Sequence, residues 1–209
     1  MMKNGHVVYK RAYGMADLEH GAPITPSTPF HVASVSKQFT AAAIMLLAQD
    51  GKLSLDDDVH KYVPEVPDFH YPITLGNLLH HSSGLRDQWD LLELAGWRYS
   101  LDLITNDDIL SVLMRQKELN FRPGDRFFYS NTGYTLLGEI VKRVSGESLR
   151  NFTTERIFKP LGMTSTHFRV VVAELIHGQA YGYQPTKGGG WRLSVTNFDT
   201  AGQPAFLPP

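Results

Sequence analysis

The 209-residue sequence contains no cysteine, and its apolar residues form no run long enough to cross a bilayer. The absence of cysteine excludes disulfides, thiolate nucleophiles and thiolate metal sites. Residues 1–6 precede only a short apolar stretch, so the sequence shows no signal-peptide core. The cellular location stays open, because an exporting segment upstream of these residues would leave the same pattern.

The sequence also lacks an excess of charge of either sign. Lys and Arg together number 20 and Asp and Glu 21, for a formal net charge of −1 at pH 7. Basic residues are scattered rather than clustered, so we expect neither nucleic acid nor an anionic membrane as a partner. Small molecules and peptides remain as candidate partners.

Helical patterns dominate the chain between an N-terminal strand and a loop-rich end that begins near residue 179. Residues 5–14 are rich in β-formers and predict a strand after a turn at Asn4-Gly5. Residues 35–49 predict a helix that is apolar on nearly all sides and therefore buried. Polar caps ahead of apolar residues predict four further helices: Thr74 to Leu79, Asn106 or Asp107 to Gln116, Asn131 or Thr132 to Gly146, and Ser148 to a stop before Pro160.

Ser34 and Lys37 form a Ser-x-x-Lys pattern at the start of the predicted buried helix. At positions i and i+3 the two side chains share one helix face. The positive end of the helix dipole favours a developing alkoxide on Ser34, and the Ser34 backbone N–H is a candidate oxyanion donor. The competing interpretation makes Ser34 a helix cap and Lys37 a surface residue.

Tyr129 and Asn131 lie far downstream, in a loop that opens the second long helix. A tyrosine hydroxyl can pass a proton between nucleophile and leaving group, and the Asn131 amide can bind a substrate carbonyl while its oxygen holds Lys37. The structural alternatives are core packing of Tyr129 beside Phe127 and Phe128, and a helix-cap role for Asn131.

Longer segments in the same order carry a family resemblance. The chain resembles the class C β-lactamase and serine esterase branch of the β-lactamase superfamily, which includes penicillin-binding proteins. The segments that carry it are 33–41 (ASVSKQFTA), 49–57 (QDGKLSLDD), 78–85 (LLHHSSGL), 121–134 (FRPGDRFFYSNTGY) and 160–163 (PLGM).

The resemblance implies an α+β fold with an antiparallel sheet, an all-helical lobe and an active site between them. It implies catalytic roles for Ser34, Lys37 and Tyr129 and substrate binding by Asn131. The expected units are residues 1–51, the start of the α/β lobe with the nucleophile helix, residues 52–178, the mainly helical lobe, and residues 179–209, the loop-rich start of the return to the α/β lobe.

The family has a third motif, in which Lys or His is followed by Thr or Ser and then by Gly. In the family, this motif lies on a strand that supplies the second oxyanion donor. We do not find it in this sequence. Lys187-Gly188-Gly189 is a loose match that comes too early and is interpreted as a glycine-rich loop. We therefore expect a chain truncated at its C-terminus, with the family pattern lost over 201–209, and an incomplete sheet. An unpaired sheet edge predicts a homodimer or a strand swap.

Two other polar clusters do not predict a metal site. His80 and His81 are adjacent, so they point in different directions, and no third ligand follows at helical spacing. Residues 56–58 are three aspartates, which we interpret as a solvated loop. No cofactor and no metal are expected.

Three functions fit these observations. The first is a serine hydrolase that works through an acyl-enzyme on esters, β-lactams or D-amino-acid peptides, with esters slightly favoured. The second is a catalytically impaired penicillin-binding or interaction module, which the absence of the third motif favours. The third is an inactive fragment.

Overall fold

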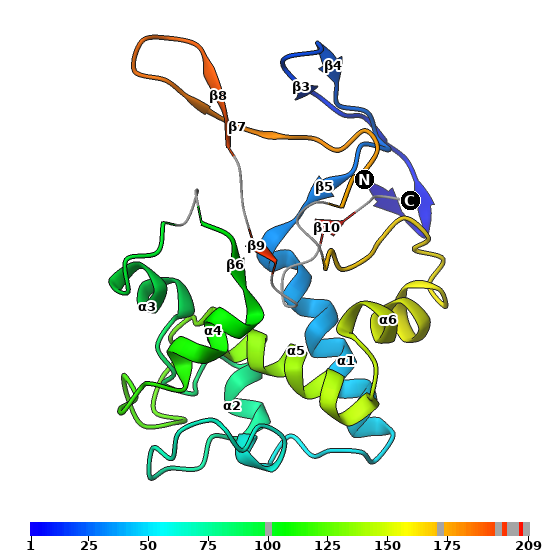
Figure 1. The fold of residues 1–209 in the computed structure, drawn as a ribbon. Coiled ribbons are helices and arrows are strands. Elements are labelled where there is room, and N and C mark those ends of the chain that lie inside the picture. The colour runs from blue at the N-terminus through cyan, green and yellow to red at the C-terminus, as the bar shows by residue number, and fades with distance from the viewer. Residues whose placement is uncertain (99–101, 171–173, 195–197, 200–204, 207–209) are drawn as a thin grey trace.

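The computed structural model describes residues 1–98, 102–170, 174–194, 198–199 and 205–206. Helix α1 (Lys37–Gln49) runs through the middle of the molecule, with the other helices beside and below it. Most strands lie on the side of its N-terminal end, and two hairpins extend far from it (Figure 1). The departure from the family pattern expected over 201–209 falls largely outside the described residues.

The described strands form two-stranded pairs instead of one continuous sheet. Four pairs are antiparallel (β1 with β2, β3 with β4, β5 with β10, β7 with β8), and β6 pairs with β9 in parallel. The strands are β1 (Met2–Lys3), β2 (His6–Val7), β3 (Met15–Asp17), β4 (Ala22–Pro23), β5 (Phe30–His31), β6 (Ile104–Thr105), β7 (Gly182–Pro185), β8 (Trp191–Ser194), β9 (Phe198–Asp199) and β10 (Ala205–Phe206).

The strand predicted over residues 5–14 is wrong beyond Val7. The turn at Asn4-Gly5 forms, with φ of 49° and 78°, but residues 8–13 have no regular structure. Val7 and Val8 are 60% and 59% exposed. Since β-forming side chains stabilise a strand by packing on a half-buried face, this segment gains little from extending the hairpin.

The helices largely follow the cap signals. Thr74 caps α2 (Leu75–Leu79) with a reciprocal capping box, and Ser148 caps α6 (Leu149–Thr153), which continues as the single π-helical stretch η3 (Thr154–Phe158). Helix α5 (Asn131–Ser145) ends at Gly146, whose φ of 75° is the left-handed conformation that glycine adopts without strain. The short 3-10 helix η2 (Val59–Lys61) precedes α2.

Two helix predictions need correction, and one helix was not predicted. Thr105, not Asn106 or Asp107, caps α4, because its hydroxyl accepts the Asp108 N–H, and α4 (Asn106–Leu113) ends before Gln116. Helix α3 (Gln88–Leu94) was not predicted, because its 7 residues are too short a window to show a helical period. The predicted helix at 35–49 begins at Lys37 and follows a 3-10 turn, η1 (Ala33–Ser36).

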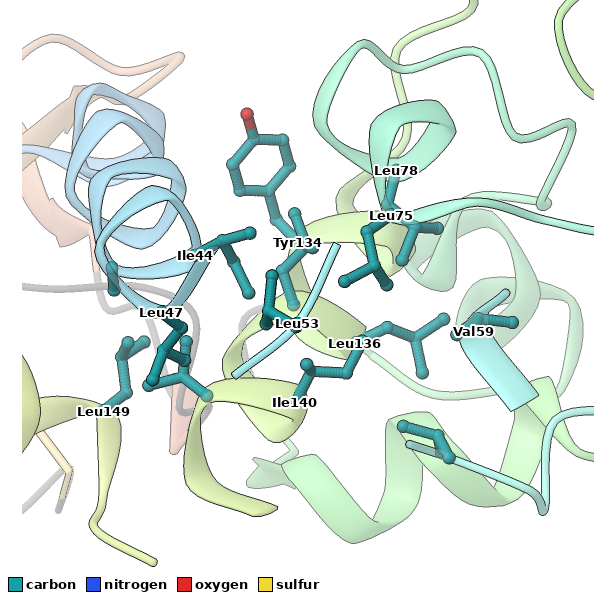
Figure 2. Close-up of a cluster of buried hydrophobic side chains, with 14 of the residues drawn as sticks. Ile44, Leu47, Leu53, Val59, Leu75, Leu78, Tyr134, Leu136, Ile140 and Leu149 are labelled. Carbon is teal, nitrogen blue, oxygen red and sulfur yellow. The ribbon is translucent and has the colours of Figure 1, made fainter. Parts of the chain in front are cut away.

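The core lies where α1, α2 and α5 meet (Figure 2). Ile44 and Leu47 of α1 point toward α5, and Leu136 of α5 points away from α1 toward Val59. These side chains and that of Ile140 on α5 are fully buried. Helix α1 is not buried on all sides as predicted, since Met45 is 51% exposed. Among the described elements, α1 packs mainly against α5, α6 and η3, and these leave Met45 uncovered.

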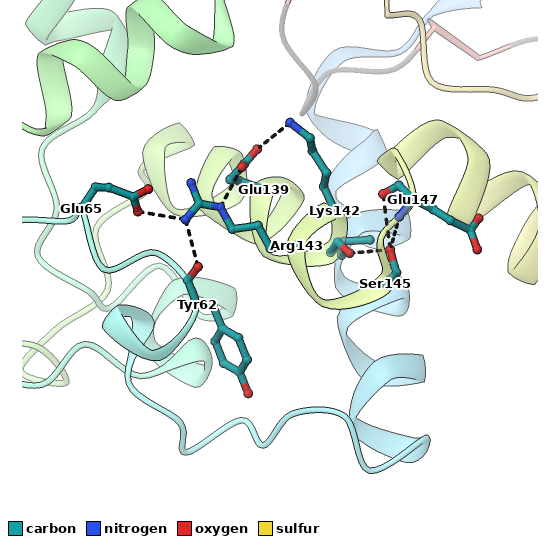
Figure 3. Close-up of polar contacts among 8 residues, drawn as sticks. Tyr62, Glu65, Glu139, Lys142, Arg143, Ser145 and Glu147 are labelled. Carbon is teal, nitrogen blue, oxygen red and sulfur yellow. Dashed lines mark hydrogen bonds and ion pairs between the residues drawn. The ribbon is translucent and has the colours of Figure 1, made fainter.

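A polar brace ties α5 to the segment after η2 (Figure 3). Arg143 donates to Glu139 one turn earlier, to Glu65 at 2.9 Å and to the Tyr62 carbonyl at 3.1 Å. The Glu65 and Arg143 side chains are partly exposed, so each ion pair contributes little, and the brace acts mainly by fixing the orientation of the two segments.

Backbone pairing between two loops prepares the site. The His81, Ser82 and Gly84 carbonyls accept hydrogen bonds from residues 128, 124 and 120, each at 2.8 Å. The segment 81–84 therefore lies alongside the segment that leads to Tyr129. Gly84 has a φ of 75°, and a Cβ there would lie 2.1 Å from the Phe121 carbonyl oxygen.

We expect Gly84→Ala to destabilise the fold by about 2–4 kcal/mol, because it combines backbone strain with a clash against fixed backbone. Thermal unfolding should show Tm lowered by roughly 5–15 °C. Gly162→Ala is the matched control, since Gly162 also has a positive φ of 67° but open space around its Cβ position. Equal shifts in the two variants would contradict the close-approach explanation.

Candidate active site

Ser34 lies on η1, directly after strand β5 and before α1. Ala33, the residue before it, has a φ of 46°, which is left-handed backbone that a non-glycine residue rarely adopts. Ser34 is exposed, so its hydroxyl is open to a ligand. The cap interpretation of Ser34 is wrong, because Val32 and Ser36 hold the N-cap positions of η1 and α1.

Lys37 is the first residue of α1 and only 8% exposed. Its Nζ donates to Ser34 Oγ at 3.1 Å and to Asn131 Oδ1 at 2.8 Å. The Nζ also lies 5.0 Å from the centre of the Tyr129 ring and 5.5 Å from that of Tyr134. The interpretation of Lys37 as a surface residue is therefore wrong, and the amine points at the hydroxyl as the i, i+3 spacing predicts.

Tyr129 brings a phenol from the helical part of the chain to Ser34. Its hydroxyl donates to Ser34 Oγ at 2.7 Å. The ring is 42% exposed, and its neighbours Phe127 and Phe128 are 68% and 50% exposed. Core packing, the structural alternative for Tyr129, is therefore wrong.

Asn131 begins α5 and joins the same group through its side chain. Its Oδ1 accepts the Lys37 hydrogen bond, and its Nδ2 donates to Asp87 Oδ2 at 2.9 Å. The N-cap position of α5 is Ser130, without a side-chain cap bond, so the helix-cap interpretation of Asn131 is wrong. The structure thus brings together all four predicted side chains around one exposed hydroxyl.

The His81 ring packs against the ring of Tyr129. The two rings stack with centroids 4.5 Å apart, and the His81 Nδ1 lies 3.3 Å from the Ser130 backbone nitrogen. Its φ of 54° is left-handed backbone, and its ring centroid also lies 5.1 Å from that of Tyr134. Burial, followed by the positive charge of Lys37, lowers the pKa of the His81 imidazole from its ordinary 6.5.

We expect NMR titration to place the His81 midpoint below pH 6.5, while His20, whose pKa the Asp17 carboxylate raises, titrates above it. The folded state holds His81 neutral, so it binds fewer protons than the unfolded state. The stability due to His81 is therefore present above pH 6.5 and falls as the pH drops toward its folded pKa. A His81 midpoint above that of His20 would be the opposite of this expectation.

Sequence reasoning missed Asp87 and the role of His81. Asp87 is 8% exposed and accepts hydrogen bonds from both the backbone N–H and the Nδ2 of Asn131, at 2.6 Å and 2.9 Å. An aspartate ahead of a short helix indicates a helix cap, and Asp87 does cap α3. Nothing in the sequence around Asp87 indicates that it also binds Asn131. The sequence indicated His81 only as a candidate metal ligand.

The polar clusters weighed as metal sites are occupied by local contacts. His80 bonds to the Gly76 carbonyl, and His81 turns toward Tyr129. Asp58 caps η2, and Asp57 accepts from the Tyr62 hydroxyl and then Lys61, which lower its pKa to about 2. Within the described ranges, no three His, Asp or Glu side chains gather as a metal site would require.

Among the helices that the structure describes, none is both long enough and apolar enough to cross a membrane.

Lys187-Gly188-Gly189, the loose match to the third motif, forms the exposed turn between β7 and β8. It therefore lies in a hairpin loop, as interpreted from the sequence.

Comparisons with known proteins agree on one family. A family model described as Beta-lactamase matches residues 1–202. Penicillin-binding protein 4* of Bacillus subtilis (strain 168) is 36% identical over 184 residues, which cover 87% of this chain and 40% of that protein. The chain spans 36–40% of the length of the first curated relatives that it matches.

Two solved structures share the fold. The octameric penicillin-binding protein homologue from Pyrococcus abyssi has a TM-score of 0.85 and 34% identity, covering 99% of this chain and 48% of that one. The D-amino acid amidase from Ochrobactrum anthropi SV3, complexed with L-phenylalanine amide, has a TM-score of 0.76 and 30% identity, covering 94% and 56%. These neighbours confirm the predicted α+β, β-lactamase/transpeptidase-like fold class.

Proposed function

The chain belongs to the beta-lactamase family, and from this premise we propose that it is a serine hydrolase that works through an acyl-enzyme on Ser34. The observation that carries the proposal is the convergence of an amine and a phenol on one exposed hydroxyl, at 3.1 Å and 2.7 Å. A nucleophile with a base within hydrogen-bond reach is the arrangement that acyl transfer requires.

The acylation step assigns one role to each side chain. Ser34 Oγ bonds to the carbonyl carbon of the substrate, and its proton passes to the pair formed by Lys37 and Tyr129. The carbonyl oxygen becomes an oxyanion near the N-terminal end of α1, where the Ser34 backbone N–H is the donor that we assign. Tyr129 then delivers the proton to the leaving oxygen or nitrogen as that bond breaks.

Deacylation reverses these roles. Water attacks the ester carbon, its proton returns through Lys37 and Tyr129 to Ser34 Oγ, and the carboxylic acid leaves. Asn131 holds Lys37 through Oδ1, and we propose that its carboxamide also contacts the substrate carbonyl region. The group needs no metal or cofactor for this sequence of steps.

The proposed substrates are esters, β-lactams and D-amino-acid peptides or amides. Two of the reported relatives are named as penicillin-binding proteins and one as a D-amino acid amidase, which supports this range. Because this sequence lacks the third motif, one oxyanion donor of two is unassigned, and its loss would slow turnover by about 10²–10³-fold.

The same missing motif supports the second candidate, a catalytically impaired penicillin-binding or interaction module that acylates slowly or only binds. Two further expectations stay predictions. One is the division of the chain into units 1–51, 52–178 and 179–209. The other is self-association through unpaired strand edges, which the exposed apolar side chains of Trp191 and Leu193 on β8, at 63% and 48%, support.

One experiment distinguishes the candidates. The protein is mixed with a p-nitrophenyl ester and separately with a penicillin, and released product and intact mass are recorded together. Turnover that requires Ser34 supports the hydrolase. A stable mass adduct without turnover supports the binding module, and neither adduct nor turnover supports an inactive fragment.

A further inference from the structure

The carboxylate of Asp87 joins the first residues of two helices beside the site. Its Oδ1 accepts the Trp89 backbone N–H at 2.9 Å and so caps α3. Its Oδ2 accepts the Asn131 backbone N–H at 2.6 Å and the Asn131 Nδ2 at 2.9 Å, at the start of α5. Asp87 is 8% exposed, and burying a carboxylate is costly unless hydrogen bonds satisfy it, as they do here.

The hydrogen bonds on Asn131 determine which way its carboxamide faces. A carboxamide has one accepting end and one donating end of almost the same shape, so its own geometry does not choose between two orientations. Ionised Asp87 can only accept, and it therefore holds the Nδ2 end. The Oδ1 end is left facing Lys37 Nζ, which donates to it at 2.8 Å.

A continuous polar chain follows from this orientation. It runs from the Asp87 carboxylate through the Asn131 carboxamide to Lys37 Nζ and then to Ser34 Oγ. Hydrogen bonds in such a chain polarise one another, and the buried negative charge at one end strengthens the acceptor that holds Lys37.

We propose that Asp87 is a positioning residue that fixes the Asn131 carboxamide so that its oxygen holds Lys37 at Ser34. The inference rests on the proposed function for its effect on rate, but the orientation of Asn131 is independent of whether the chain turns over. Asp87 itself touches no reacting atom.

Asp87→Asn is the sharpest variant, because it keeps the size of the side chain and asparagine caps helices as well as aspartate. With its oxygen capping α3, its NH2 group faces the two Asn131 donors. The Asn131 carboxamide is then expected to turn, which places a donating NH2 group against Lys37 Nζ in place of the accepting oxygen and displaces that amine from Ser34. Asp87→Ser also keeps a cap but is too short to reach Asn131.

The kinetic test is a double-mutant cycle with p-nitrophenyl ester. We expect Asp87→Asn to slow acylation by about 10²-fold in the otherwise unchanged chain, as a misplaced catalytic group does. In the Asn131→Ala background the same substitution should cost less than about 3-fold, since the group through which Asp87 acts is gone. Equal losses in both backgrounds would overturn the proposal, because a merely structural role does not depend on the Asn131 side chain.

A second measurement is independent of activity. The side-chain NH2 signals of Asn131 in a ¹⁵N-¹H spectrum are identified by their absence in Asn131→Ala. In the unsubstituted protein, one proton should be shifted downfield by its carboxylate acceptor, and Asp87→Asn and Asp87→Ser should both remove that shift. Signals that stay unchanged in both variants would refute the inference even if the protein hydrolyses esters, and the expected changes would uphold it even if the protein does not.

Discussion

Ser34→Ala is expected to lower ester turnover by more than about 10³-fold and to eliminate any covalent penicillin adduct, while leaving the fold intact. The side chain is exposed and lies on a 3-10 turn, so removing one oxygen opens no cavity in the core. What is lost is the nucleophile, and background hydrolysis then depends on binding alone. Initial rates of p-nitrophenol release, with circular dichroism as the check on folding, measure the effect.

Ser27→Ala is the matched control for Ser34. Ser27 is also exposed and lies seven residues earlier, where its hydroxyl bonds to the Thr25 hydroxyl, which also accepts the Ser27 backbone N–H. We expect its rates to equal those of the unsubstituted protein. Turnover that survives in Ser34→Ala would remove Ser34 from the nucleophile role and leave the geometry of the site without a function.

Lys37→Met is expected to lower turnover by about 10²–10⁴-fold, the range that general acid–base groups contribute. Methionine fills much of the space of the buried lysine stem, so the change removes the amine while leaving α1 packed. Without Nζ, Ser34 loses its partner at 3.1 Å and Asn131 Oδ1 its donor at 2.8 Å. Steady-state kinetics should show the loss in kcat, with KM little changed.

Lys52→Met provides the comparison for the loss of one positive charge. Lys52 is exposed and lies just beyond the other end of α1. We expect it to retain normal kcat, because an exposed charge at that distance is screened. If Lys37→Met kept normal kcat and pH dependence, the amine would be a structural group and another base would have to act on Ser34.

The parts of the site that the sequence predicted are those that local spacing or a long motif defines. The i, i+3 spacing placed Lys37 behind Ser34 because helix geometry depends on neighbours alone. Tyr129 and Asn131 came from the family resemblance, since no local rule connects residues nearly a hundred positions apart. Their hydrogen bonds to Ser34 and Lys37 confirm the predicted proximity, and their catalytic roles remain proposals.

The parts that the sequence did not predict depend on tertiary contacts. The sequence around Asp87 indicates a helix cap. Tertiary contacts bring it beside Asn131, among them the pairing of segment 81–84 with residues 120–128 and the Thr132 hydroxyl donating to the Arg86 carbonyl. The strand predicted over 5–14 failed for a related reason, because β-forming residues need a surface to cover and Val7 and Val8 remain exposed.

The central claim, that Ser34 becomes acylated, is tested most directly by locating the adduct. After incubation with penicillin, the protein is digested with trypsin, and the peptide 12–37 is sequenced by tandem mass spectrometry. We predict the added mass on Ser34, and its absence in the digest of Ser34→Ala. An adduct on Ser27 or Ser36 of the same peptide, or on any other residue, would contradict the account.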